Sequence, residues 1–94
     1  MSRPKKYRNV RCDPAAYYFK PRGIPLCELE EVVLEADELE ALRLADHLGL
    51  TQQEAAFEMK ISRATFGRII GRARKKTAES LVNGKAIKIC LKGD

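Results

Sequence analysis

Two helix-start signals lie eleven residues apart near the middle of the chain, and they constrain the fold more than any other feature. Thr51 is followed three residues later by Glu54, the capping-box pattern in which each side chain bonds a backbone N–H at a helix start. Ser62 is a second N-cap candidate. The sequence therefore predicts a helix over residues 52–59, a turn over 60–62 and another helix directly after it.

The second of these helices is predicted to run from about Arg63 to Val82, where Asn83-Gly84 is a strong stop signal. Two capped helices joined by so short a turn cross at a steep angle, which is the geometry of a helix-turn-helix. In this motif the second helix enters the major groove of DNA. The first expectation from the sequence is therefore a DNA-reading unit.

The helix from Arg63 has two distinct faces when its residues are placed 100° apart. The predicted core face holds Phe66, Ile69, Ile70, Ala73, Thr77 and Leu81. The opposite face holds Ala64, Arg68, Gly71, Arg72 and Lys75. Small residues let a helix approach the floor of the groove, while arginines reach guanine edges or grip phosphates. From Arg63 and Arg74, nearer the flanks, we expect phosphate contacts or internal salt bridges.

Residues outside that face complete the predicted DNA-binding set. Gln52 and Gln53 open the first helix, which crosses the DNA backbone in docked proteins of this type. A basic arm at the start of the chain could reach a minor groove or act as a nonspecific tail. The whole predicted set is Ser62, Arg63, Ala64, Thr65, Gly67, Arg68, Gly71, Arg72, Lys75, Gln52, Gln53, Arg3, Lys5 and Lys6.

Charge is strongly segregated along the chain, although its net value is only +5. Residues 1–25 carry seven basic and one acidic side chain, and residues 59–94 carry ten basic and two acidic. Residues 26–58 carry ten acidic side chains and one basic. A chain of this kind is expected to have one positive face, which suits a polyanion such as nucleic acid.

The remaining elements complete a single domain over residues 1–94, mainly helical, with three helices and a few short strands. A basic arm and extended segment form residues 1–25, and the helical core spans 36–82, with its first helix over Ala36–Leu48 on the spacing of Leu39, Leu42, Ala45 and Leu48. Short strands are predicted at 17–19, 31–34 and 85–92. The last could pair with Val32–Leu34 or with a second subunit, and Ile87, Ile89 and Leu91 are the candidate dimer edge.

Other classes of protein find little support. Cys12, Cys27 and Cys90 lack metal-finger spacing, although Cys12 and Cys27 could meet in space as a metal or redox sensor. His47, the only histidine, is placed near a helix end, where interaction with the helix C-terminus is favoured over metal ligation. No nucleophile–base pair, membrane span or secretory signal is apparent, so we expect a cytoplasmic protein that is not an enzyme and needs no metal or other cofactor.

Gln52 to Ile70 resembles the helix-turn-helix of bacterial repressors, with Ala56 at the small position where the two helices touch. Asp37 to Lys76 also resembles the last DNA-binding region of sigma factors. One departure is Lys60, where such motifs usually carry a glycine with a left-handed backbone; a lysine there is expected to cost on the order of 1 kcal/mol.

The whole chain is similar to a family of small prokaryotic proteins predicted to bind DNA, domain-of-unknown-function family 134, also called uncharacterised protein family 0251. Arg22 and Glu35 depart from its common pattern, since many relatives have a small residue and a threonine there. The resemblance implies a prokaryotic source and DNA binding. It rests on Arg3-Pro4, Tyr18–Pro21, Gly23–Leu26, Glu28–Leu34, Glu40–Leu44, Gln53–Ala56, Ser62-Arg63, Thr65-Phe66, Arg68-Ile69 and Asn83–Ala86.

The function expected from the sequence is sequence-specific binding of double-stranded DNA by a homodimer that regulates transcription. A dimer is expected because one small reading head gives limited specificity. Two alternatives stay open. One is a protein-interaction module that docks the transcription machinery, with RNA polymerase as the candidate partner, through the acidic stretch Glu28–Glu40 or the basic helix. The other is a metal- or thiol-responsive regulator.

Overall fold

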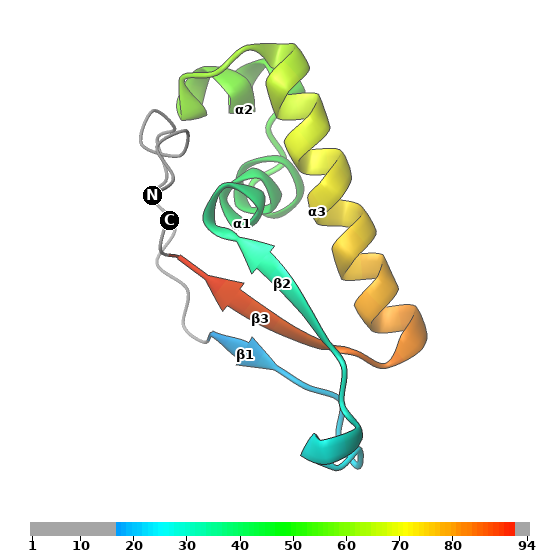
Figure 1. Cartoon of the computed structure of the whole chain (residues 1–94). Coiled ribbons are helices and arrows are strands. Elements are labelled where there is room, and N and C mark those ends of the chain that lie inside the picture. Colours follow the sequence, from blue (N-terminus) through cyan, green and yellow to red (C-terminus); the bar gives the residue numbers. More distant parts are fainter. Residues whose placement is uncertain (1–16, 92–94) are drawn as a thin grey trace.

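A computed structural model describes residues 17–91 and shows three helices beside a small mixed sheet (Figure 1). The fold is mainly helical with a few short strands, as predicted. Strand β3 runs between β1 and β2, while α3 extends along the molecule from the end occupied by α2 to the end of the sheet (Figure 1). In chain order the elements are β1 (Tyr18–Phe19), the 3₁₀ turn η2 (Leu26–Glu28), β2 (Glu31–Glu35), α1 (Ala36–Leu42), the π-helical segment η3 (Arg43–His47), α2 (Gln52–Met59), α3 (Arg63–Asn83) and β3 (Ala86–Cys90).

Both predicted helix starts are confirmed. Thr51 Oγ1 accepts the Glu54 N–H at 3.1 Å, and Glu54 Oε1 accepts the Thr51 N–H at 2.9 Å. Ser62 Oγ accepts the Thr65 N–H at 3.1 Å. Between the helices Lys60 adopts φ 59° and ψ 43°, the left-handed conformation expected where glycine would be easier. The two caps fix where α2 and α3 begin, and the left-handed Lys60 marks where α2 ends.

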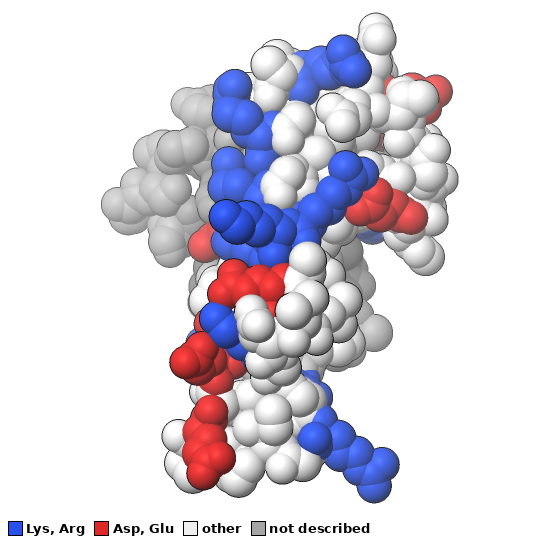
Figure 2. Space-filling view, turned by 90° about the vertical axis from the view of Figure 1, so that its right-hand side faces the viewer, with Lys and Arg blue, Asp and Glu red and all other residues white. Residues whose placement is uncertain are grey.

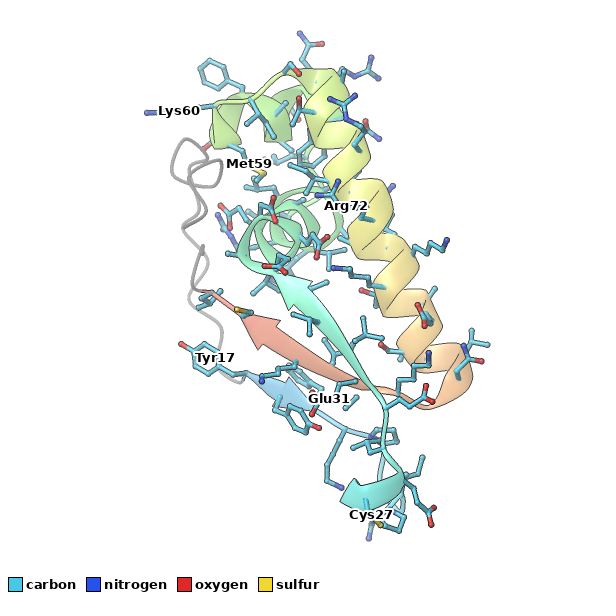
Figure 3. The ribbon with its side chains drawn as sticks, in the orientation of Figure 1. Tyr17, Cys27, Glu31, Met59, Lys60 and Arg72 are labelled. Carbon is cyan, nitrogen blue, oxygen red and sulfur yellow. The ribbon has the colours of Figure 1, made fainter. Side chains whose placement is uncertain are left out.

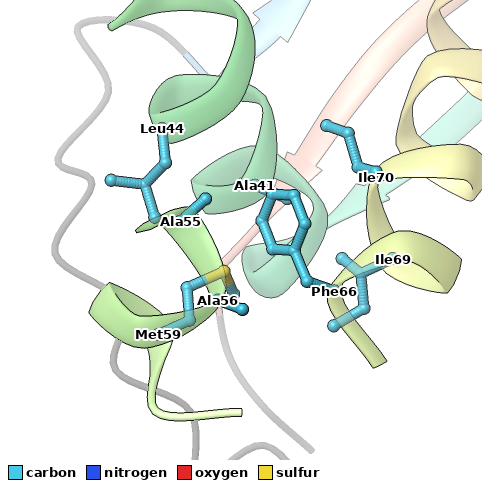
Figure 4. Packing of buried hydrophobic residues seen from close by; sticks show 8 residues of the cluster. All are labelled: Ala41, Leu44, Ala55, Ala56, Met59, Phe66, Ile69 and Ile70. Atoms are coloured by element: carbon cyan, nitrogen blue, oxygen red, sulfur yellow. The ribbon is translucent and has the colours of Figure 1, made fainter. Parts of the chain in front are cut away.

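A hydrophobic cluster joins α1, η3, α2 and α3 (Figure 4). Of the predicted core face of α3, Phe66, Ile69, Ile70 and Ala73 are confirmed as buried. The prediction that Leu81 is buried is wrong, because its side chain is 76% exposed. It lies at the margin of the core face and borders a shallow hollow instead of a packed element. The cluster consists of Ala41, Leu44, Ala55, Ala56, Met59, Phe66, Ile69 and Ile70.

The sheet brings together strands that are distant in sequence. β3 pairs in parallel with β2, which places Leu34 opposite Ile89, and it pairs antiparallel with β1. Leu34 and Ile89 form a second buried cluster with Ala73 of α3. The predicted pairing of the last strand with residues 32–34 is confirmed. The prediction of a dimer edge at Ile87, Ile89 and Leu91 is wrong, because β3 is the central strand and these side chains belong to the second cluster.

The predicted helix over 36–48 is interrupted after Leu42. Residues 43–47 form a π-helical turn, in which the Leu48 N–H donates to the Arg43 carbonyl at 2.8 Å. This wider turn rotates the following side chains relative to an ordinary helix. As a result Leu44 is buried, while Leu48, which the regular spacing placed on the core side, is 52% exposed.

Candidate nucleic-acid interface

One stripe of α3 is exposed along the first half of the helix. Ala64, Arg68, Gly71 and Lys75 are all exposed, and their spacing places them on one side of the helix. Residues 59–78 hold seven basic and no acidic side chains. Figure 2 shows Lys and Arg gathered over the upper part of the face that α3 presents, with acidic side chains below them. The stripe is therefore a narrow cationic ridge on the body of the domain.

The two glycines of this helix have no internal packing reason to be glycine. A Cβ added at Gly71 would meet nothing within 4 Å, and one added at Gly67 would lie 3.6 Å from Gln52 Oε1, an ordinary contact. Glycine inside a helix costs about 1 kcal/mol relative to alanine. Gly67 directly precedes Arg68, and Gly71 directly precedes Arg72. The two glycines therefore leave the surface of the helix flat beside these cations.

The start of α3 carries a short polar network. Ser62 Oγ donates to Thr65 Oγ1 at 2.9 Å, and Arg68 Nη2 donates to the same oxygen at 3.4 Å. Arg63 is exposed beside them. Within residues 17–91, Arg63, Arg68 and Lys75 form no ion pair, and all three are exposed. Lys75 is near enough to Glu79 to contribute, after Lys85, to the lowered pKa of that carboxyl.

The predicted residues of α2 lie at the same end of the molecule. Gln52 is half-buried against Gly67, whereas Gln53 is exposed. Arg3, Lys5 and Lys6 lie outside the described residues. The structure thus brings together the α2 start, the turn and the first half of α3, which are the predicted positions between residues 52 and 75.

Arg72 differs from the other predicted contact residues because it is held from inside the domain. Its Nε donates to Glu38 Oε2 at 3.1 Å, and Figure 3 shows it between α3 and α1. Lys76 Nζ donates to Glu38 Oε1 at 2.8 Å and to the Val33 carbonyl at 2.8 Å. Arg72 nevertheless keeps 52% of its side chain exposed. Its guanidinium is therefore oriented by Glu38 while remaining accessible.

Glu38 is a buried carboxylate that the sequence analysis did not single out. It is 1% exposed and also accepts the Glu35 N–H at 2.9 Å. Burial opposes its ionisation, but the bonds from Lys76, the Glu35 amide and Arg72 outweigh burial and hold the pKa of Glu38 below its ordinary value. The available signal was its position three residues after Glu35, the spacing of a capping box.

A second ion pair ties the other flank of α3 to η3. Arg74 Nη2 lies 2.7 Å from Asp46 Oδ1, and Arg74 Nε donates to Oδ2 at 3.1 Å. The guanidinium lowers the pKa of Asp46, and the carboxylate raises that of Arg74. An internal salt bridge was one of the two roles predicted for Arg74. The pairs on the two flanks hold α3 in place and leave the ridge between them to solvent.

The alternative sites are separated in the structure. Cys27 lies on the η2 turn and is exposed, whereas Cys90 is half-buried in β3. Cys12 lies outside the described residues, so its pairing with Cys27 stays a prediction. His47 ends η3 at the surface. Across residues 17–91, no three His, Cys, Asp or Glu side chains gather as metal ligands would, and no helix there is long and apolar enough to cross a bilayer.

The fold and this surface define a small, mainly helical domain with a three-stranded mixed sheet and a basic ridge on its longest helix. The chain belongs to the family described as "Protein of unknown function DUF134", which it matches over residues 1–94. It is 60% identical over 89 residues to a UPF0251 protein of Caldanaerobacter subterraneus, covering 95% of this chain and 75% of the relative.

Further relatives extend the comparison across prokaryotes. A UPF0251 protein of Desulfosudis oleivorans is 58% identical over 95% of this chain and 64% of its own length. One from Vibrio vulnificus is 60% identical over 93% of this chain and 87% of its own length. The names of these relatives state no activity. No solved structure is significantly similar to the chain.

Proposed function

We propose that this chain binds double-stranded DNA sequence-specifically and regulates transcription, using α2 and α3 as a helix-turn-helix. The observation that carries the proposal is the exposed stripe of α3, in which Arg68 and Lys75 lack internal ion-pair partners in the described part of the chain and Gly71 leaves the space between them open. A helix with a flat cationic ridge fits the major groove, where arginine reads guanine edges and lysine contacts phosphates.

The two flanking ion-pair networks support this use of the helix. Arg72 and Lys76 bind Glu38 on one side, and Arg74 binds Asp46 on the other. A recognition helix must be held rigidly for its contacts to discriminate between bases, because reading depends on sub-ångström positioning. Arg72 has a double role in this scheme: its Nε holds it to Glu38, and its exposed part extends the reading surface.

Selection from random duplexes at low salt, using the full chain, tests the proposal. The enriched duplex should bind with an affinity that falls steeply with salt, since each phosphate contact contributes about 0.9 to the slope of log K against log salt. Substituting Arg68→Ala together with Lys75→Ala should weaken binding by at least roughly 10-fold and flatten the sequence preference.

A matched control removes the same charge elsewhere. Arg22 and Lys88 are exposed cations away from the α2–α3 end, so Arg22→Ala with Lys88→Ala should leave binding nearly unchanged. Binding that is equal for both double variants would overturn the assignment of the ridge. Failure to enrich any duplex would overturn the proposed function itself.

A second function is favoured by one observation on α2. Phe57 is 79% exposed and borders a hollow of about 630 Å³ that Leu50 and Glu58 also line. The hollow is lined mainly by apolar surface, and an aromatic side chain beside such a hollow is typical of a protein-docking surface. RNA polymerase is the candidate partner. Phe57→Gln should abolish co-purification of polymerase subunits with the chain and leave duplex binding intact; retention of the subunits would remove this candidate.

A further inference from the structure

The C-terminal end of α3 carries an exposed apolar surface at the opposite end of the molecule from the ridge. Leu81 is 76% exposed, Val82 is 80% exposed and Phe19 of β1 is 53% exposed. Leu81 and Phe19 border a shallow hollow of about 230 Å³ that Pro21 and Ile87 also line. Burying a side chain of this size is worth about 1.5–3 kcal/mol. Several of them exposed at one helix end form a surface that a partner can cover.

The margins of this end differ in charge. Lys20 lines the hollow next to Leu81, whereas Glu28 lines a neighbouring hollow on the other side of Gly84. Lys85 lies between the two hollows and pairs with Glu30 at 3.3 Å, so the charges left for a partner are those of Lys20 and Glu28. Figure 2 shows the same pattern at the lower end of the molecule, where uncharged surface lies between an acidic margin and a basic margin. A two-fold axis through the apolar centre would place the basic margin of each copy against the acidic margin of the other. The occupant that this charge pattern fits is a second copy of the chain.

The length of α3 sets the distance between the reading segments of the two copies, and this distance fits the spacing of half-sites on DNA. Arg68, in the ridge, and Leu81 are 13 residues apart, or about 20 Å at the helical rise of 1.5 Å. Two copies joined at Leu81 would therefore place their reading segments up to about 40 Å apart. Dimeric helix-turn-helix proteins need about 34 Å between the two half-sites. If the two-fold axis inclines the two helices to each other, the distance between the reading segments shortens from about 40 Å toward the roughly 34 Å between half-sites.

We propose that the chain forms a two-fold homodimer through Leu81, Val82 and Phe19 at the C-terminal end of α3, with half-sites about one DNA turn apart. The spacing of the half-sites rests on the proposed function, whereas the dimer surface does not. This surface replaces β3 as the location of the expected dimer contact.

Sedimentation of the full chain from 1 to 100 μM tests the surface directly. Wild type should be dimeric at the upper end of this range, and Leu81→Gln with Val82→Gln should be monomeric throughout. The matched control is Leu48→Gln with Phe57→Gln, which removes two exposed apolar side chains at another surface and should remain dimeric. Far-ultraviolet circular dichroism should show unchanged helix content in both variants, because all four side chains are largely exposed.

Comparing duplexes with one and with two half-sites distinguishes a wrong dimer surface from a chain that does not bind DNA. Wild type should prefer a duplex with two half-sites over one with a single half-site by at least roughly 10-fold, and the Leu81/Val82 double variant should lose that preference while still binding the single half-site. A chain that binds DNA but stays monomeric, or a double variant that still dimerises, would overturn the dimer surface. A dimer that the double variant abolishes, in a chain that binds no duplex, would leave the surface standing and remove only its DNA-binding role.

Discussion

Gly71→Ala should stabilise the domain and weaken DNA binding at the same time. An added Cβ meets no atom within 4 Å inside the protein, so the helix gains the full difference between alanine and glycine, about 1 kcal/mol. For a domain of this size that gain raises the unfolding midpoint by about 4–8 °C. The same methyl group would project from the ridge between Arg68 and Lys75 into the space that the proposal assigns to bases.

The expected loss of affinity follows from the cost of overfilling a close contact. An extra methyl group in a well-packed contact costs about 1–3 kcal/mol, which corresponds to a roughly 5- to 150-fold increase in the dissociation constant. Thermal unfolding and titration of the selected duplex, both on the full chain, measure the two effects. Titration at 25 °C keeps both proteins folded, so that the affinity change is independent of the change in stability.

Ala78→Gly is the matched control for the helix contribution. Ala78 is exposed on the same side of α3 but lies beyond Lys75. The substitution should lower the stability by about 1 kcal/mol and leave duplex affinity unchanged. If Gly71→Ala stabilises the protein without weakening DNA binding, the ridge does not approach the groove floor and the reasoning is refuted. If it fails to stabilise, the helix at Gly71 is not the regular one described.

Two further predictions concern stability. Glu38→Gln should lower the free energy of unfolding by about 1.5–3 kcal/mol at pH 7, because it removes the buried carboxylate that accepts charge-assisted hydrogen bonds from two partly exposed cations of α3. Because the folded-state pKa of Glu38 is lowered, its contribution to stability is present above the unfolded pKa and is lost as the pH falls through the folded pKa. In urea unfolding from pH 7 to pH 3, the unfolding free energies of the variant and of wild type should therefore converge. Lys60→Gly should raise the free energy of unfolding by about 1 kcal/mol, because it removes the strain of a φ of 59°, whereas Lys60→Ala should not; equal midpoints for both variants would count against the strain.

The parts of this molecule that could be predicted from the sequence are those decided by neighbours in the chain. Thr51 with Glu54, Ser62, and Gly84 after α3 each act within a few residues, and all of them fall at the observed helix ends. The buried face of α3 around Phe66 also follows from spacing alone. Such features need no knowledge of what the helix packs against.

The parts that could not be predicted depend on partners distant in the sequence. Nothing local indicates that Glu38 is buried against Arg72, 34 residues away, or that Leu81 is exposed at the margin of its face. The π-helical turn is a similar case, because its extra residue shifts Leu48 outward although the spacing of the sequence is regular. For the candidate site, the sequence could predict which side of α3 is cationic, but not which of its cations form ion pairs within the domain.

The parallel pairing of β2 and β3 has a consequence for how the domain folds. Val32 and Ile87 face each other across the sheet but are 55 residues apart in the chain. Closing a loop of that length has an entropic cost of about 3.5 kcal/mol before any strand contact forms. The capped helices, whose contacts are local, should therefore assemble first, and hydrogen-exchange pulse labelling should find α3 amides protected before those of β3. The central strand would then be the last element to join, so that its loss would remove the sheet and the second buried cluster while leaving the contacts between the helices in place.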